Sequence, residues 1–332
     1  VGYWAYGYNA FKIDADELKP DTDNEVMVHL QNKEESSRWY PGAGLYRPVS
    51  LECMGSVSLD DWGWTVRTIE ADSLQAHIRV SATARHIAPN KRENYGVEFS
   101  IIHPEGWIEV AGHAPLDSLL TAQMDVTVHQ PRLWSPETPF LYQMRIQLTE
   151  NGRVVDQLQS KMGIRTLTFS KQKGFQLNGV SRKLQGVCLH HDLGPLGAAV
   201  NKSALIRQIE TMKAMGADAI RTSHNMPSSW QMEVCDSLGM MVMAESFDMW
   251  VYPKCKNGYA RFFKKWSDRD ITNLVLANRN HPSLIMWSIG NEIPEQWSDE
   301  GRKIAAHLQE LCHRLDPSRP VTQGMDRAED AL

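Results

Sequence analysis

The chain has 332 residues, of which 42% are hydrophobic and 23% charged, and its formal net charge is −5. This composition is typical of a globular protein, and the length suggests two or three domains. A mildly acidic chain lacks the electrostatic footprint of nucleic-acid or anionic-membrane binding, and no run reaches the about 18 apolar residues of a spanning helix. No secretory signal is visible in the first residues. The true N-terminus is expected to be absent, so periplasm and cytoplasm both stay open as locations.

The first half of the chain is predicted to be all-β. Short alternating segments separated by turn residues recur up to about residue 163, which is the pattern of a β-sandwich. A break near residues 51–53 would divide this region into a short first piece, 1–52, and a second piece, 53–163, of the usual size of an immunoglobulin-like sandwich. The expected strands are residues 10–14, 25–30, 46–53, 74–84, 96–102, 124–129 and 140–149.

From residue 164 onward the rhythm changes to strand followed by helix. Near-continuous apolar strands that alternate with amphipathic helices indicate a parallel sheet covered by helices. One expected helix begins just after Pro227 and ends at Gly239, which are residues typical of a helix start and a helix end. The expected strands are residues 183–191, 218–224, 240–246, 283–292 and 319–325, and the expected helices are residues 201–217, 228–239, 263–278 and 298–316.

Two architectures compete for this second half, a doubly wound open sheet and a (β/α)8 barrel. No glycine-rich nucleotide-binding motif follows any expected strand. In barrel enzymes the active site is assembled from the C-terminal ends of several strands. This pattern favours the barrel, of which residues 164–332 would supply about five strands. The polar residues at the ends of the expected strands are His190, His191, Asp192, Arg221, His224, Asn225, Glu245, Asn291 and Glu292.

Five segments carry a resemblance to a known family. Residues 175–197 ("FQLNGVSRKLQGVCLHHDLGPLG"), 219–246 and 279–292 ("RNHPSLIMWSIGNE") closely resemble glycoside hydrolase family 2, which includes β-galactosidases, β-glucuronidases and β-mannosidases. Residues 39–51 ("WYPGAGLYRPVSL") resemble the end of the family's jelly-roll sugar-binding domain, and residues 132–148 resemble the closing strands of its immunoglobulin-like domain.

The fold that this resemblance implies is multidomain, with β and α/β parts. It consists of a jelly-roll remnant in residues 1–52, an immunoglobulin-like β-sandwich in residues 53–163, and the N-terminal part of a TIM (β/α)8 barrel in residues 164–332.

The resemblance also implies roles for individual residues. Glu292 takes the position of the general acid/base, which must protonate the departing glycosidic oxygen and then, as carboxylate, activate water. Asn291 would bind the 2-hydroxyl of the sugar. His190 and His224 match positions that line the subsite of the non-reducing sugar.

Other residues at the strand ends are supporting candidates. Arg221 is expected to tie the strand ends together by charged hydrogen bonds, with Asn225 beside it. Glu245 either binds the substrate or pairs with Arg221. Trp250 is a candidate wall for sugar stacking, whereas Trp287 is expected to be barrel packing.

No metal and no cofactor are expected. The histidine that helps to hold magnesium in some β-galactosidases of the family is absent after Glu245, and the five cysteines form no CxxC pair. The family's nucleophile is a second Glu on the seventh strand, which would lie beyond Leu332. The chain is therefore expected to be an internal fragment that is inactive alone.

The expected function is hydrolysis of terminal β-D-galactosides by a bacterial retaining exo-glycosidase. Residues 190–201, 245–250 and 290–296 resemble the β-galactosidase branch of gut-type bacteria. β-Glucuronidase is the first alternative, and a non-catalytic carbohydrate-binding fragment is an alternative of another class. The expected partner is a carbohydrate substrate, without nucleic acid or membrane, and a homo-oligomer stays open.

Overall fold

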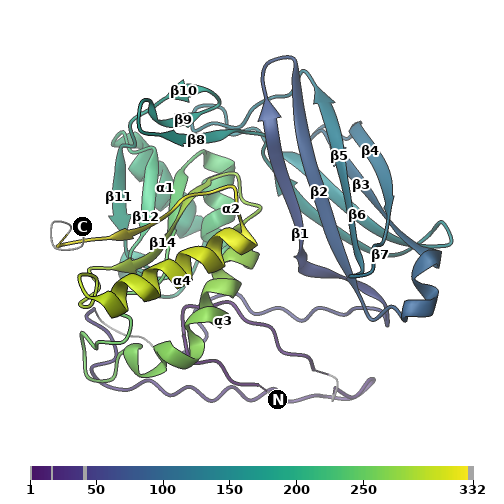
Figure 1. Ribbon diagram of the computed structural model, residues 1–332. Helices are drawn as coiled ribbons and strands as arrows, with labels where there is room; N and C mark the ends of the chain where they lie inside the picture. Colours follow the sequence, from purple (N-terminus) through teal and green to yellow (C-terminus); the bar gives the residue numbers. More distant parts are fainter. Residues whose placement is uncertain (1, 16–17, 40–42, 328–332) are drawn as a thin grey trace.

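The computed structural model describes residues 2–15, 18–39 and 43–327, so that positions 40–42 of the family-like segment lie outside the described residues. Three parts follow one another along the chain (Figure 1): an extended N-terminal segment, a β-sandwich, and an α/β domain with a parallel sheet.

The β-sandwich consists of two antiparallel sheets, and it confirms the immunoglobulin-like sandwich predicted from the sequence. Burial alternates along its strands, because a strand with one face on the core buries every second side chain. Strands β1, β4 and β7 were not among the expected ones. The first sheet has the order β1 (Ser58–Ala71), β2 (Gln75–Arg85), β5 (Thr121–His129), and the second has the order β4 (Ile108–Pro115), β3 (Tyr95–Ile102), β6 (Tyr142–Glu150), β7 (Arg153–Met162). A short 3₁₀ helix, Pro89–Asn94, precedes β3.

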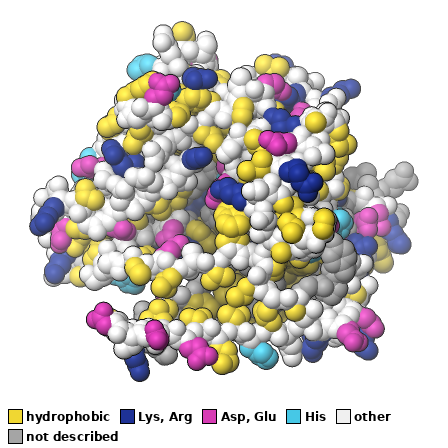
Figure 2. All heavy atoms as spheres, turned by 180° about the vertical axis from the view of Figure 1, so that it is seen from behind, with side chains coloured by type: hydrophobic (Ala, Val, Ile, Leu, Met, Phe, Trp, Pro, Cys, Tyr) yellow, Lys and Arg dark blue, Asp and Glu magenta, His cyan; other side chains and the backbone are white. Residues whose placement is uncertain are grey.

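The prediction of sandwich strands in residues 1–52 is wrong for the described residues, none of which lies in a strand. A β-strand needs a neighbour for its backbone hydrogen bonds, and this segment instead runs along one end of the α/β domain (Figure 1). Its aromatic residues Trp4, Tyr6 and Tyr8 pack against that domain. Val26 and Met27 of this segment are exposed. Figure 2, which views the molecule from behind, shows hydrophobic side chains gathered on its lower part. The assignment of this segment to a jelly roll stays a prediction.

A small antiparallel sheet precedes the first parallel strand, so the expectation that the strand–helix rhythm starts at residue 164 is wrong. Its strands are β8 (Leu167–Ser170), β9 (Gly174–Leu177) and β10 (Val180–Ser181). Phe175 and Leu177 of β9 pack with Ala219, Met241 and Ile285, which lie at the beginnings of three parallel strands. The small sheet therefore closes the N-terminal end of the parallel sheet, opposite the N-terminal segment (Figure 1).

The parallel sheet confirms the partial barrel. Its five strands are neighbours in the order in which they occur along the chain, and every pairing is parallel. A doubly wound sheet would reverse its strand order at a switch point, so the order itself decides for the barrel. The strands are β11 (Gly186–Leu189), β12 (Ala219–Thr222), β13 (Met241–Glu245), β14 (Leu284–Asn291) and β15 (Val321–Gly324), and the helices are η2 (Gly194–Leu196), α1 (Lys202–Ala214), α2 (Ser229–Leu238), α3 (Ala260–Asn278) and α4 (Asp299–Leu315).

The sandwich and the α/β domain are joined by side chains that bind backbone carbonyls across the junction. Arg165 donates to Pro282 O and Leu284 O, at 2.8 Å each. Arg279 donates to Trp62 O at 2.7 Å. Charged hydrogen bonds of this kind are stronger than neutral ones, so they fix the α/β domain against the sandwich.

Candidate active site

Strand β14 delivers a carboxylate to the open end of the parallel sheet. Leu284, Trp287 and Ile289 are buried along it, with exposures of 0 to 3%. The chain then turns at Glu292, whose φ of 44° is uncommon for a residue other than glycine. The Glu292 N–H donates to Gly324 O at the end of β15, at 2.7 Å, and the Glu292 side chain is 49% exposed. The apolar strand therefore ends by presenting a carboxylate to solvent.

Asn291, the last residue of β14, is held at both ends of its side-chain amide. It is 2% exposed, its Oδ1 accepts from Arg221 Nη2 at 2.9 Å, and its Nδ2 donates to Asp248 Oδ1 at 3.1 Å. Because a cation faces the oxygen and a carboxylate faces the nitrogen, the orientation of the amide is determined.

Glu245 is fully buried at the end of β13 and makes no contact with solvent. Its Oε2 accepts from Arg221 Nε at 2.7 Å and from Ser288 Oγ at 2.5 Å, while its Oε1 lies 2.7 Å from His224 Nδ1. The expectation that Glu245 contacts the substrate directly is therefore wrong. The structure shows the other expected role, pairing with Arg221. Burial acts to lower the pKa of Arg221, but the charge and the hydrogen bond of Glu245, together with the contact to Cys188, raise that pKa above its ordinary value.

His190 and His224 form an aromatic group with Trp39 of the N-terminal segment. The two imidazole rings are 5.3 Å apart in a T-shaped arrangement, and the Trp39 ring lies 5.0 Å from His190 and 5.8 Å from His224. Trp39 Nε1 donates to Tyr8 Oη at 3.3 Å. Burial, and then the neighbouring His224, lower the pKa of His190, which favours its neutral form. Sequence reasoning missed Trp39, although it begins the family-like segment 39–51.

A charged group that the sequence analysis also missed connects the N-terminal segment to Asn291. Arg38 binds Asp248 through two hydrogen bonds, Nε to Oδ2 at 2.8 Å and Nη2 to Oδ1 at 2.6 Å, and Arg38 Nη2 lies 4.0 Å from Glu292 Oε2. Lys254 Nζ donates to Asn291 O at 2.7 Å and to Asp248 Oδ1 at 3.2 Å. Burial acts to raise the pKa of Asp248, but Arg38, Lys254 and the hydrogen bond from Asn291 together bring that pKa below its ordinary value.

These contacts form a closed circuit around the strand ends. It runs from Arg38 through Asp248, Asn291, Arg221, Glu245 and His224 to Trp39, the chain neighbour of Arg38. The structure thus brings the ends of three strands, β12, β13 and β14, and the N-terminal segment to one place.

Two further candidates lie below this surface. Asn225 is 4% exposed, and its Nδ2 lies 3.4 Å from His191 Nδ1. Trp250 is fully buried and donates to Ile289 O at 2.9 Å. The proposal of Trp250 as a sugar-stacking wall is wrong, because no face of its ring reaches solvent. Trp287 is fully buried, as expected for barrel packing.

Two features are absent from residues 2–15, 18–39 and 43–327. In that part of the chain no group of three or more His, Cys, Asp or Glu side chains is placed to hold a metal ion. Within the same residues no helix has the length and apolarity to cross a membrane.

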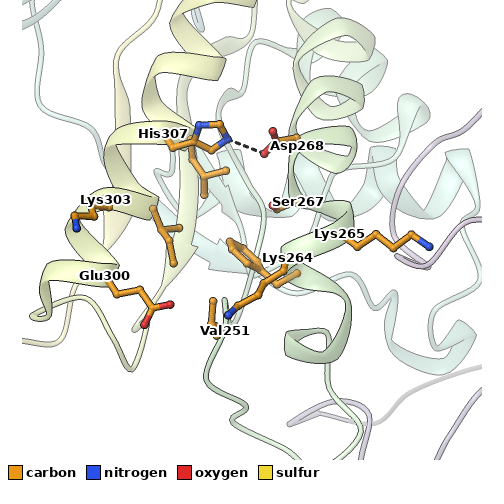
Figure 3. Close-up of a pocket in the computed structure, with 11 residues that line it drawn as sticks. Val251, Lys264, Lys265, Ser267, Asp268, Glu300, Lys303 and His307 are labelled. Atoms are coloured by element: carbon orange, nitrogen blue, oxygen red, sulfur yellow. Dashed lines mark hydrogen bonds and ion pairs between the residues drawn. The ribbon is translucent and has the colours of Figure 1, made fainter.

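A separate hollow of about 440 Å³ lies between α3 and α4 (Figure 3). Lys264 and Glu300 point toward each other across it, and His307 Nε2 lies 2.8 Å from Asp268 Oδ1 at its edge. None of the site residues named from the sequence lines this hollow, so it is distinct from the strand-end site.

Comparison with family models matches residues 57–165 to "Glycosyl hydrolases family 2" and residues 170–332 to "Glycosyl hydrolases family 2, TIM barrel domain". The chain belongs to glycoside hydrolase family 2. It is similar to β-galactosidase BoGH2A of Bacteroides ovatus, with 38% identity over 98% of this chain and 42% of that protein. It is also similar to a putative β-glucuronidase of Formosa agariphila, with 32% identity over 99% of this chain and 31% of that protein.

Solved structures of the family agree with the fold. A crystal structure of a family 2 member from Bacteroides cellulosilyticus aligns with a TM-score of 0.83 and 37% identity, over 90% of this chain and 39% of that one. The family 2 chain therefore spans less than half the length of these relatives.

The strand-end site of this family 2 chain combines carboxyl, amide and aromatic groups. Glu292 offers a half-exposed carboxyl group, and the rings of Trp39, His190 and His224 form an aromatic group at the ends of β11 and β12. Asn291 keeps one amide hydrogen and one oxygen lone pair beyond those used by its two partners. The arrangement can therefore bind hydroxyl groups and transfer a proton at Glu292.

Proposed function

We propose that the complete protein is a retaining exo-glycosidase that hydrolyses terminal β-D-galactosides, with Glu292 as general acid/base. The observation that carries this proposal is the half-exposed Glu292 carboxyl group at the end of the buried strand β14, directly after Asn291 and 4.0 Å from Arg38 Nη2. The choice of galactoside is supported by the 38% identity to a protein named β-galactosidase.

In the proposed reaction, Glu292 donates its proton to the glycosidic oxygen as the bond breaks, and afterwards takes a proton from the attacking water. Asn291, whose amide orientation is held by Arg221 and Asp248, binds the 2-hydroxyl group. His190, His224 and Trp39 would surround the non-reducing sugar. Only interactions that strengthen in the transition state accelerate the reaction.

Retention needs a second carboxyl group at about 5–5.5 Å from the first. Glu245 does not suit this role, because it is fully buried and both of its oxygens are engaged. The family resemblance assigns the nucleophile to a Glu on a later barrel strand outside these residues. By itself this chain is therefore proposed to be inactive.

Two other functions are alternatives to β-galactosidase activity. β-Glucuronidase activity is favoured by the Formosa agariphila relative, which is named a putative β-glucuronidase. The second alternative is not an enzyme activity but a non-catalytic carbohydrate-binding role. A panel of nitrophenyl glycosides, tested on the complete protein, separates the three: galactoside cleavage, glucuronide cleavage, or binding without cleavage.

The variant Glu292→Gln tests the proposed role, because it keeps the shape of the side chain and removes its proton. A poor leaving group such as a sugar alcohol needs that proton, so lactose-like substrates should react about 10²–10⁴-fold more slowly. The first step on nitrophenyl galactosides should be nearly unchanged, and added azide, which needs no base, should restore turnover as β-galactosyl azide.

The matched control is Glu300→Gln on the surface of α4, which should leave all rates unchanged. Equal losses of Glu292→Gln on good and poor leaving groups, without azide rescue, would show that Glu292 has a purely structural role.

A further inference from the structure

Asp248 lies at the contact between two parts of the chain that are far apart in sequence. It follows strand β13 and is 8% exposed, and its carboxylate accepts hydrogen bonds from Arg38, Lys254 and Asn291. One buried carboxylate therefore joins the N-terminal segment to the amide beside Glu292.

The stretch around Arg38 has no strand to hold it in place. Besides Asp248, the contact that docks it comes from Asn257, whose backbone N–H donates to Glu35 O at 2.9 Å and whose Nδ2 donates to Glu34 O at 2.8 Å. Both partners belong to the connection between β13 and α3. The contacts of Asp248 and Asn257 therefore hold the stretch that carries Trp39, whose indole also donates to Tyr8 Oη at 3.3 Å.

We propose that Asp248 is a positioning residue: its ion pair with Arg38 clamps residues 34–39 over the strand ends, and its hydrogen bond to Asn291 orients that amide. The catalytic part of this inference rests on the proposed glycosidase function. A paired arginine–carboxylate contact fixes direction as well as distance, so it positions Trp39 as one wall of the sugar subsite.

The two partners of the clamp are not equivalent. Loss of Arg38 leaves Asp248 paired with Lys254, so it releases the N-terminal segment alone. Loss of the Asp248 charge releases the segment and also weakens the acceptor of the Nδ2 end of Asn291. Arg38 should therefore affect binding of the sugar, whereas Asp248 should affect both binding and the chemical step.

The experiment compares Arg38→Met, Asp248→Asn and the double variant in the complete protein, measuring kcat and KM on a nitrophenyl galactoside. Arg79→Met is the matched control, since Arg79 makes the same two-point contact with Asp125 on the sandwich surface, at 2.7 Å for each bond. A charge-assisted contact supports an expected rise in KM of about tenfold for Arg38→Met with little change in kcat. Asp248→Asn should raise KM similarly and also lower kcat.

Because both substitutions break one contact, the double variant should be no worse than Asp248→Asn alone. Arg38→Lys, which lacks the fork, should lie between the wild type and Arg38→Met. Additive losses in the double variant, or losses as large in Arg79→Met, would overturn the clamp.

Amide hydrogen exchange of residues 34–39 provides a readout that does not depend on catalysis. Exchange should be faster in Arg38→Met and Asp248→Asn and unchanged in Arg79→Met. Unchanged exchange in the first two variants would overturn the clamp. Faster exchange in a protein whose wild type cleaves no glycoside would support the clamp and overturn the proposed function instead.

Discussion

Replacement of the buried Glu245 tests whether its ion pair stabilises the strand ends. Glu245 is the acceptor for Arg221, His224 and Ser288, and it has no exposed surface. Glu245→Gln keeps the volume and one acceptor oxygen but leaves Arg221 without a counter-charge. Glu245→Ala removes both acceptors and adds a cavity.

The magnitude follows from burial. Removing one partner of a buried ion pair costs about 3–5 kcal/mol in the free energy of unfolding. Because the amide oxygen introduced by Glu245→Gln can still accept from Arg221 and Ser288, the loss in the free energy of unfolding should be near the lower value, about 3 kcal/mol. For a domain of this size, each kcal/mol lowers the melting temperature by about 2–4 °C, so a decrease of roughly 6–12 °C is expected. Glu245→Ala should cost more, since three donors lose their acceptor.

The assay is thermal unfolding of the complete protein, with Glu233→Gln as the matched control. Glu233 pairs with Lys202 at 2.6 Å, but the two side chains are 47% and 49% exposed. Exposed pairs contribute at most about 1 kcal/mol, so the control should melt within about 4 °C of the wild type. Equal decreases for Glu245→Gln and Glu233→Gln would refute the reasoning from burial.

Two further predictions concern pH and packing. Burial, and then the charge of Arg47, lower the pKa of His191 to about 4, so as pH falls from 6.5 towards 4 the unfolded state gains a proton that the folded state excludes. The free energy of unfolding should therefore decrease by roughly 2 kcal/mol between pH 7 and 4.5. Urea unfolding at the two pH values should show a smaller decrease for His191→Gln than for the wild type. The same pH dependence in both proteins would contradict this. Gly239→Ala should be destabilising, because φ is 74° and an added Cβ would lie 2.5 Å from Pro136 O. Gly216 also has a positive φ, 95°, but an added Cβ would meet no atom within 4 Å. Gly216→Ala should therefore show only the backbone cost of about 1 kcal/mol. Equal urea midpoints for the two alanine variants would exclude the clash.

Much of the architecture could be predicted from the sequence, because it depends on local periodicity. Alternating burial along β2 and β6 produces the period-2 pattern of the sandwich. The near-continuous apolar run of β14 and its abrupt polar end mark a parallel strand that finishes at Glu292. The strand-end rule of barrels then brings His190, His224 and Asn291 to the same edge without any knowledge of their contacts.

Other features were decided by tertiary structure, since they depend on partners far away in the sequence. Trp250 and Trp39 are both aromatic residues near strand-end motifs, but packing buries Trp250 completely and leaves Trp39 beside the two histidines. Arg38 and Asp248 are 210 positions apart, so no local pattern predicts their contact.

The N-terminal segment shows the same division. Its alternating residues 25–30 have the period of a strand, but a strand forms only where another strand supplies hydrogen-bond partners, and the described residues of this segment have none. The sequence by itself therefore determined which segments could form strands and which polar residues end them. Only the tertiary structure decided which strands are paired and which side chains are buried, because pairing and burial depend on groups brought together from distant parts of the chain.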